Sequence, residues 1–273
     1  MLWIAATVSL TAAPSEVLVD KHRVVYESRG SGEPVLVLVH GWTCDRSLWE
    51  PQMNAFSEKY RVIAVDLPGH GESDKPKDIV YDSKLFAKAV LAVMDRARAG
   101  QAVLIGHSMG LPVIREVYAE APGRVRALVS VDGSVLKGSL AEFAKQLKGE
   151  QGLENRRKFL DSFYDKSTPA TVRERVAESM LGAPEHVAVS AMSTAVGYDW
   201  DHAGPVTAVP VLSISRKRPN TNYEKLFREA FPHADYREMD GVGHFLHLEK
   251  PVEFNAMVLE FVDWIPKADT QTR

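Results

Sequence analysis

Apolar runs and segments with helical periodicity alternate along most of the chain. The run Val-Leu-Val-Leu-Val at 35–39 is continuous and β-branched, which is typical of a strand buried on both faces of a parallel sheet. The pattern predicts strands at 17–20, 23–28, 35–39, 61–65, 102–106, 126–131, 210–215 and 234–239, and helices near 47–57 and at 82–98, 111–120, 222–230 and 251–264. Such alternation predicts an α/β fold with a mostly parallel sheet and helices on both of its faces.

The strand pattern stops between residues 134 and 204. Gly, Pro and Ser/Thr breaks separate four helical stretches there, at 140–148, 154–164, 170–180 and 184–196. An insertion at this point predicts a helical cap over 135–204, with the core formed by 14–134 and 205–273. The cap is rich in Phe, Tyr and Met, and these side chains, with Phe143 and Phe163 as examples, could form its own core or an apolar ceiling for a ligand. For any single one, packing is the commoner role.

Composition fits one globular domain. The chain has 273 residues, of which 45% are hydrophobic, and this is enough to bury a substantial core. The 33 Lys and Arg nearly balance the 36 Asp and Glu, so no long-range field favours nucleic acid or an anionic membrane. The local run 216–218, Arg-Lys-Arg, is interpreted as a solvated loop. A single cysteine, Cys44, excludes an intrachain disulfide, and no cluster with metal-ligand spacing implies a metal or another cofactor.

The first thirteen residues form a separate segment. Residues 2–10 are apolar but too short to span a bilayer, and they resemble the central part of a secretory signal without its basic start. If residues 1–13 belong to a signal peptide, the protein is periplasmic or secreted, and otherwise it is cytoplasmic. The sequence predicts no stable membrane span and leaves the oligomeric state open.

The segment 106–110, Gly-His-Ser-Met-Gly, directly follows an apolar run and precedes a helical stretch. A serine hydroxyl is a weak nucleophile, so it must be presented on a sharp turn between strand and helix where a histidine can take its proton. Gly106 and Gly110 lack Cβ atoms, which lets neighbouring backbone approach a serine in a strained conformation. Ser108 is therefore the candidate nucleophile.

The apolar run at 34–39 ends in His40, Gly41 and Trp42. A tetrahedral intermediate needs two fixed backbone N–H donors, one usually from the residue after the nucleophile and one from the loop after an early strand. Met109 and Trp42 occupy these places and are the candidate oxyanion hole. In the alternative interpretation, His40 and Gly41 only make a tight turn and Trp42 is a core residue.

A glycine-rich loop near the C-terminus, Met-Asp-Gly-Val-Gly-His at 239–244, places His244 just before a helical stretch. The imidazole of His244 is the candidate general base. In a doubly wound sheet, ligands bind beyond the carboxyl ends of the strands, and the candidate residues all follow strands.

Four motifs occur in a characteristic order: His-Gly-Trp at 40–42, Asp-Leu-Pro-Gly-His-Gly-Glu-Ser at 66–73, Gly-His-Ser-Met-Gly at 106–110, and Gly-His at 243–244. On these motifs the chain resembles the α/β-hydrolase superfamily, specifically its single-domain esterase-like members with a helical cap, from about residue 24 to 265. The resemblance implies a serine hydrolase, because dehalogenase and epoxide-hydrolase relatives attack with an aspartate at the position of Ser108. The segment 66–73 adds no chemistry, and His70 is interpreted as structural.

The acid of the triad departs from the common pattern of this superfamily. Many relatives carry it a few residues after the penultimate strand, here 210–215, but the next acid in this chain is Glu224. Some members carry it after the preceding strand instead, and here Asp132 follows the strand 126–131. Asp132 is therefore the predicted triad acid, which holds the histidine tautomer; otherwise it forms a turn.

Other residues compete with Asp132 for this role. Asn220 and Asn222 could orient an imidazole as an amide does in some cysteine proteases, and we rank them below Asp132. Asp199 and Asp201 lie where the cap rejoins the core and are interpreted as cap or hinge residues.

Together these features predict a serine hydrolase acting on a small to medium, largely uncharged carboxylic ester. A lactone, an amide or a carbon–carbon bond flanked by ketones is an alternative substrate. Two further hypotheses stay open: a ligand receptor of the same fold with slow turnover, which a partner-binding surface on the cap would favour, and an enzyme weakened by the missing late acid. Only a small-molecule partner is implied.

Overall fold

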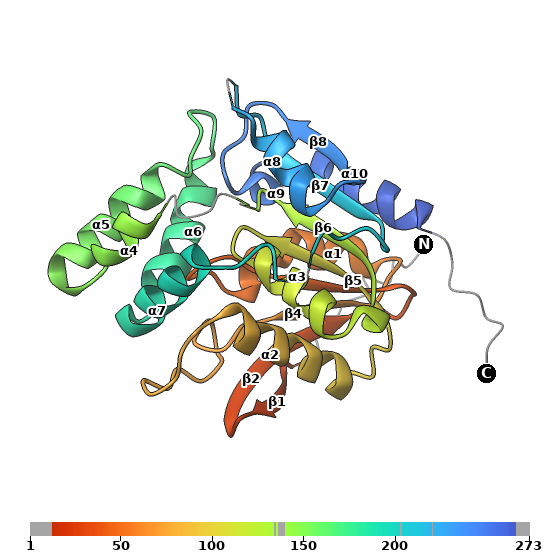
Figure 1. Ribbon diagram of the computed structural model, residues 1–273, viewed down its shortest axis with the longest axis horizontal. Helices are drawn as coiled ribbons and strands as arrows, with labels where there is room; N and C mark the ends of the chain where they lie inside the picture. Colours follow the sequence, from red (N-terminus) through yellow and green to blue (C-terminus); the bar gives the residue numbers. More distant parts are fainter. Residues whose placement is uncertain (1–12, 134, 136–139, 203, 220, 266–273) are drawn as a thin grey trace, which may run out of the picture.

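The computed structural model describes residues 13–133, 135, 140–202, 204–219 and 221–265 (Figure 1). The predicted signal-like segment lies outside the described residues except for its last residue. Within the described ranges, no helix has both the length and the apolarity to cross a membrane.

The described strands form one eight-stranded sheet in the order β1-β2-β4-β3-β5-β6-β7-β8. The first two pairings are antiparallel and all others are parallel. The strands are β1 (Ser15–Val19), β2 (His22–Arg29), β3 (Val35–Val39), β4 (Val62–Val65), β5 (Ala102–His107), β6 (Val125–Val131), β7 (Val211–Arg216) and β8 (Asp235–Met239). The predicted fold class is confirmed.

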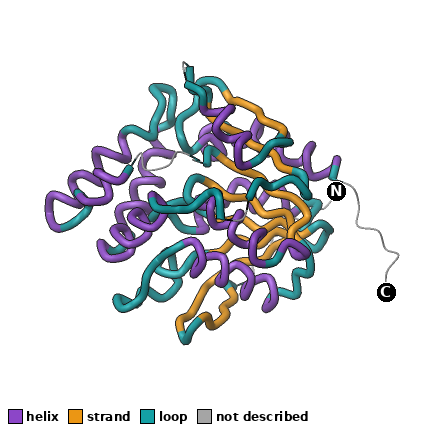
Figure 2. The backbone as a smooth tube through the Cα atoms, viewed as in Figure 1, coloured by secondary structure: helices purple, strands orange, loops and turns teal. Residues whose placement is uncertain are grey.

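Helices cover both faces of this sheet (Figure 2). Alternate residues of a strand point to opposite faces, so Val37 of β3 packs in one hydrophobic cluster and Leu38 in the other. One cluster includes side chains of α2 (Ser83–Arg96), α3 (Gly110–Glu120) and α8 (Tyr223–Ala230); the other includes those of α1 (Glu50–Ser57) and α10 (Pro251–Trp264). Shorter elements are the 3-10 helices η1 (Arg46–Trp49) and η2 (Pro122–Arg124), and helix α9 (Leu246–Glu249).

Strand register brings the candidate segments to one edge of the sheet. Val39 of β3 pairs with Gly106 of β5, and His107 of β5 pairs with Val131 of β6. The last paired residue of β6, Val131, in turn pairs with Ile214 of β7. The loops that begin at residues 40, 108, 132 and 217 therefore leave neighbouring strands at the same end.

A helical insertion lies between β6 and β7, at the left of Figure 1. It contains α4 (Ala141–Lys145), α5 (Gly149–Asp161), α6 (Ala170–Gly182) and α7 (Glu185–Val196). Hydrogen bonds attach it to the core: the Trp42 indole donates to the Ala188 carbonyl (2.9 Å), and the Ser179 hydroxyl donates to Asp45 (2.6 Å). The four helices fall inside the segment for which the sequence predicts a cap.

Candidate active site

Ser108 stands on a strained turn between β5 and α3. Its φ of 53° lies in the left-handed region that non-glycine residues rarely adopt. The two flanking glycines are sterically required, because a Cβ on Gly106 would lie 2.5 Å from the Gly110 carbonyl oxygen, and one on Gly110 would lie 2.5 Å from that of Val39. The turn is fixed by a 3.0 Å hydrogen bond from the Ser108 N–H to the Val131 carbonyl.

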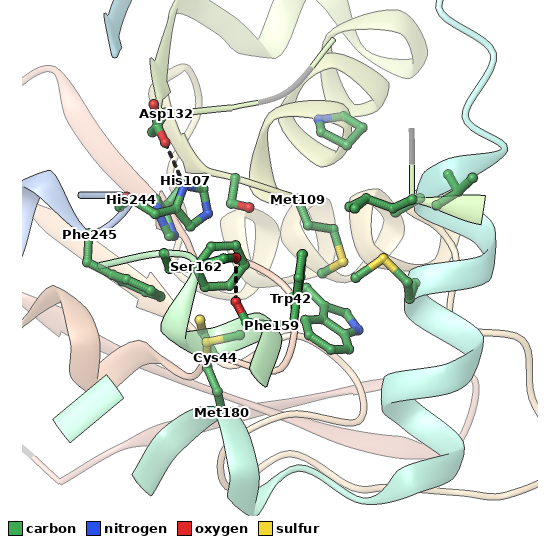
Figure 3. A pocket seen from close by; sticks show the side chains of 18 of the residues that line it. Trp42, Cys44, His107, Met109, Asp132, Phe159, Ser162, Met180, His244 and Phe245 are labelled. Carbon is green, nitrogen blue, oxygen red and sulfur yellow. Dashed lines mark hydrogen bonds and ion pairs between the residues drawn. The ribbon is translucent and has the colours of Figure 1, made fainter. Parts of the chain in front are cut away.

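His244 lies in the loop after β8 and is held on several sides. Its Nδ1 is 2.6 Å from Oδ2 of Asp132, an interaction marked by a dashed line in Figure 3. Its backbone N–H donates to the Phe163 carbonyl (2.7 Å). The His244 carbonyl accepts from Nε2 of His107 (3.0 Å), and the Phe163 ring lies 4.5 Å from the imidazole, centroid to centroid. The ring therefore has one defined orientation, with Nδ1 toward Asp132.

The electrostatic surroundings keep His244 neutral. Burial has the largest effect and lowers the pKa of His244. The hydrogen bond and charge of Asp132 raise this pKa, and the charges of Arg216 and Arg218 lower it. The net pKa lies below the ordinary value of a histidine. A neutral imidazole whose Nδ1 donates to a carboxylate has its Nε2 lone pair available to accept a proton.

Asp132 directly follows β6 and is completely buried. Besides His244, it receives the backbone N–H of Arg216 (3.1 Å) and Nη2 of Arg218 (2.8 Å), both on Oδ1. Burial raises the pKa of Asp132, but the His244 hydrogen bond and the charges of His244, Arg218 and Arg216 outweigh it, so the pKa is lowered. The carboxylate is thus ionised beside the imidazole.

The competing residues do not take this place in the described part of the chain. Asn222 occupies the N-cap position of α8, where its side chain makes no capping hydrogen bond, and Asn220 lies outside the described residues. Asp199 accepts the N–H of Asp201 (2.9 Å) in the loop after α7. Among the described residues, Asp132 is the carboxylate that contacts the His244 ring.

The interpretation of 216–218 as a solvated loop is wrong for two of its three residues. Lys217 is exposed and pairs with Asp240 (3.1 Å), but Arg216 and Arg218 turn inward to Asp132. Side chains alternate in extended backbone, so residues 216 and 218 share a side when the chain continues straight beyond β7. That two-residue spacing, next to a buried aspartate, was the available signal.

The backbone of Gly41 and Trp42 passes directly beside Ser108. A Cβ on Gly41 would lie 3.1 Å from that of Ser108. His40 shapes this turn, because its Nε2 accepts the Leu67 N–H (3.0 Å) while Nδ1 lies 2.8 Å from the Gly41 carbonyl oxygen. Within the described chain, neither the Trp42 nor the Met109 backbone N–H donates a hydrogen bond, and both residues line the cavity described next.

Ser108, Asp132 and His244, together with Gly41, Trp42 and Met109, line a cavity of about 280 Å³ between the strand ends and the helical insertion (Figure 3). Its apolar wall includes Trp42, Cys44, Met109 and Pro112 of the core and Phe159, Phe163, Met180 and Met192 of the insertion. Burial raises the pKa of the Cys44 thiol well above its ordinary value, so it stays protonated. Across the described residues, no group of three or more His, Cys, Asp or Glu side chains is arranged to hold a metal ion.

Sequence reasoning gave no role to His107, and it treated Phe163 as a residue of the cap core or of a ligand ceiling; the structure places both rings against His244. His107 is fully buried, and burial lowers its pKa well below that of a free histidine. Its position before the serine gave no indication of a contact with a loop 137 residues away.

The chain is similar to known proteins in both sequence and fold. The family model described as alpha/beta hydrolase fold matches residues 34–251. A 2-hydroxy-6-oxononadienedioate/2-hydroxy-6-oxononatrienedioate hydrolase of Burkholderia vietnamiensis is 31% identical, over 88% of this chain and 91% of that protein. A putative esterase/lipase of Haemophilus influenzae is 28% identical, over 80% and 79%. The structure of a thermophilic esterase from Thermogutta terrifontis superposes with a TM-score of 0.83 at 21% identity, covering 94% of this chain and all of that one.

Proposed function

The chain belongs to the α/β-hydrolase fold family, and we propose that it is a serine hydrolase of small to medium carboxylic esters. The observation that carries this proposal is the Asp132–His244 pair at the wall of the cavity that also contains Ser108. An ionised acid, a neutral imidazole and a serine on a strained turn are the three groups that acyl transfer needs.

In the proposed mechanism, Nε2 of His244 takes the Ser108 proton while Oγ attacks the ester carbonyl carbon. The backbone N–H groups of Trp42 and Met109 donate to the resulting oxyanion. The intermediate collapses, and the alcohol leaves with the proton from His244. A water molecule then gives one proton to His244 and attacks the acyl carbon, and Ser108 leaves with that proton as the acid is released.

Asp132 acts in this mechanism without changing its own protonation. It keeps the proton of neutral His244 on Nδ1 and stabilises the imidazolium that forms in each step. The lowered pKa of Asp132 supports this role, because a protonated acid could do neither.

The helical insertion serves as the cap of this enzyme, and we assign 135–204 to it. Phe159 and Met180 supply apolar wall to the cavity, and a covered cavity keeps bulk water from the reacting groups. Core segments 14–134 and 205–273 then carry the catalytic residues.

Hydrolysis of a carbon–carbon bond is the second candidate. The Burkholderia vietnamiensis relative acts, by its name, on a hydroxy-oxo dicarboxylate, and such a molecule contains no ester. The same residues could serve that reaction, so the distinction rests on substrate and not on the triad.

Graded p-nitrophenyl esters from acetate to decanoate test the proposal, together with a fluorophosphonate probe. Wild type should turn over a short ester and be labelled at Ser108, and Ser108→Ala should lose about 10³-fold or more in kcat. Ser162, a second serine of the same cavity, donates to the Phe159 carbonyl (2.6 Å), so Ser162→Ala should still be labelled at Ser108. Probe labelling without turnover would favour a receptor, and labelling elsewhere would refute the assigned nucleophile.

A further inference from the structure

The charges along the cavity wall do not balance. Of the described residues that line it, three carry a formal charge: Asp132, Arg216 and Arg218. His244 is neutral at pH 7, as argued above. Two guanidinium groups therefore face one carboxylate.

Asp132 has no further capacity to compensate them. Its Oδ1 already accepts the Arg216 N–H and Nη2 of Arg218, and its Oδ2 accepts from Nδ1 of His244 with Nε of Arg216 at 3.5 Å. One carboxylate neutralises one unit of positive charge, so a second unit stays on this wall.

Nearby acids are engaged or directed elsewhere. Glu224 pairs with Arg228 (2.8 Å), Asp240 pairs with Lys217 (3.1 Å), and Glu238 is exposed on β8. No ion pair joins any of the three to Arg216 or Arg218 within the described chain.

One nitrogen of the Arg218 guanidinium has no hydrogen-bond partner among the described residues. The guanidinium lies over the Tyr223 ring, 4.2 Å from the centroid, and the unpartnered nitrogen is its buried Nη1. A buried donor without a partner costs free energy, and so does an uncompensated charge. Because the rest of the wall is largely apolar, an anion there would interact strongly with the two arginines.

We propose that Arg216 and Arg218 form a subsite for a carboxylate group of the substrate. The preferred substrate is then a half-ester of a short dicarboxylic acid, in place of the uncharged ester that the sequence predicts. This inference rests on the proposed serine hydrolase, because the ester must reach Ser108 while the carboxylate reaches the arginines. Arginine suits the role, since its planar fork matches a carboxylate.

Monomethyl esters of succinic, glutaric and adipic acid, each compared with its dimethyl ester, test this in a pH-stat. At least one monomethyl ester should have a kcat/KM about 10-fold or more above that of its neutral counterpart, and 0.5 M NaCl should reduce the preference. Arg218→Met should remove most of it while the dimethyl ester is still cleaved. Lys217→Met removes the same charge from the adjacent, outward-facing residue and should keep the preference.

Binding supplies a readout that does not require turnover. Monomethyl glutarate should bind Ser108→Ala in a calorimetric titration, and Ser108→Ala/Arg218→Met should bind it about 10-fold or more weakly. Thermal unfolding of each variant shows that it is folded.

The outcomes separate the two proposals. Turnover of neutral esters with no preference for the charged ones would overturn the carboxylate subsite and leave the serine hydrolase standing. An equal loss for both ester types in Arg218→Met, with binding unchanged in the double variant, would make Arg218 only a positioning residue of Asp132. If no ester is cleaved and Ser108 is not labelled, the hydrolase proposal fails, and the binding comparison still decides the subsite.

Discussion

Replacing Asp132 by asparagine tests the triad most directly, because the structure predicts how the new amide will lie. Oδ1 of Asp132 faces two N–H donors, from Arg216 (3.1 Å) and Arg218 (2.8 Å), whereas Oδ2 faces only Nδ1 of His244 (2.6 Å) at hydrogen-bond distance. An amide NH₂ turned to the arginines would set donors against donors twice. The amide oxygen will therefore stay with the arginines, and the NH₂ will face His244.

That orientation forces the wrong tautomer. Nδ1 of His244 must then accept a hydrogen bond, so the proton moves to Nε2, which can no longer deprotonate Ser108. We expect kcat to fall by about 10⁴-fold, or about 5.4 kcal/mol of transition-state stabilisation. Loss of the charge beside two arginines should also lower the free energy of unfolding by about 3 kcal/mol.

Single-turnover kinetics with p-nitrophenyl acetate measure the rate, ¹⁵N NMR of the imidazole reports the tautomer, and urea unfolding measures stability. Asp240→Asn is the matched control, because Asp240 is exposed and contacts Lys217; its rate should stay within about 2-fold. A kcat for Asp132→Asn within tenfold of wild type would refute the reasoning. So would a large loss with the proton still on Nδ1.

Three further predictions follow from pKa values and packing. The pKa of His244 is lowered, so kcat/KM should rise with pH, be half-maximal below pH 6.5 and then level off; Arg218→Gln should move the midpoint upward, and a wild-type midpoint above 6.5 would contradict the assignment. Phe159→Ala enlarges the cavity without touching His244, so it should shift the optimum of p-nitrophenyl esters to longer acyl chains with little change in acetate turnover. Leu153 is half-exposed on the same helix, and Leu153→Ala should leave the optimum unchanged. Burial lowers the pKa of His247 to about 3, so between pH 6 and 4.5 the unfolded chain binds a proton that the folded chain excludes. The free energy of unfolding should therefore fall with decreasing pH, and His247→Gln should reduce the slope of that dependence by up to about 1.4 kcal/mol per pH unit in urea titrations. An unchanged slope would contradict this.

The aromatic residues of the helical insertion also show what the structure adds to sequence reasoning. From sequence, Phe143 and Phe163 were equally good candidates for a cavity ceiling. The Phe163 ring packs on His244, so its removal would disturb the base as well as the pocket. Phe143 is not among the described lining residues and packs on Trp42 and Phe159 instead. Which face of a helix meets a cavity depends on packing between elements that periodicity does not specify.

Most of the fold could be predicted because each strand and each long helix leaves its own pattern of apolar residues in the local sequence. Buried parallel strands are continuous apolar runs, and the helix at 251–264 begins and ends where the pattern places it. Strand ends differ from prediction by at most two residues. Helix α9 was not assigned separately, because it has only four residues and too short a pattern for periodicity to register.

The site was predictable wherever a backbone requirement leaves a mark in the sequence. Ser108 needs two glycines beside it, and those glycines make the segment recognisable. Asp132 was chosen from the resemblance, since some superfamily members carry the acid after this strand, and the structure places it 2.6 Å from Nδ1 of His244. Arg216 and Arg218 carry only their two-residue spacing at the end of β7, a weaker mark that a basic run on a protein surface can also have.

The position of the acid and the identity of the residues after β7 are physically coupled in this chain. If residue 132 were neutral, Arg216 and Arg218 would be two uncompensated cations beside the cavity. If both arginines were absent, the charge of Asp132 would be buried without compensation, because His244 is neutral. Because the acid follows β6 and not β7 in this chain, the segment at the end of β7 can carry cations. Asp132 thus has two separable effects: it orients His244 through Oδ2, and through Oδ1 it holds the arginines at the cavity wall. The Asp132 carboxylate therefore contacts both the proposed base and the two arginines proposed to bind the substrate.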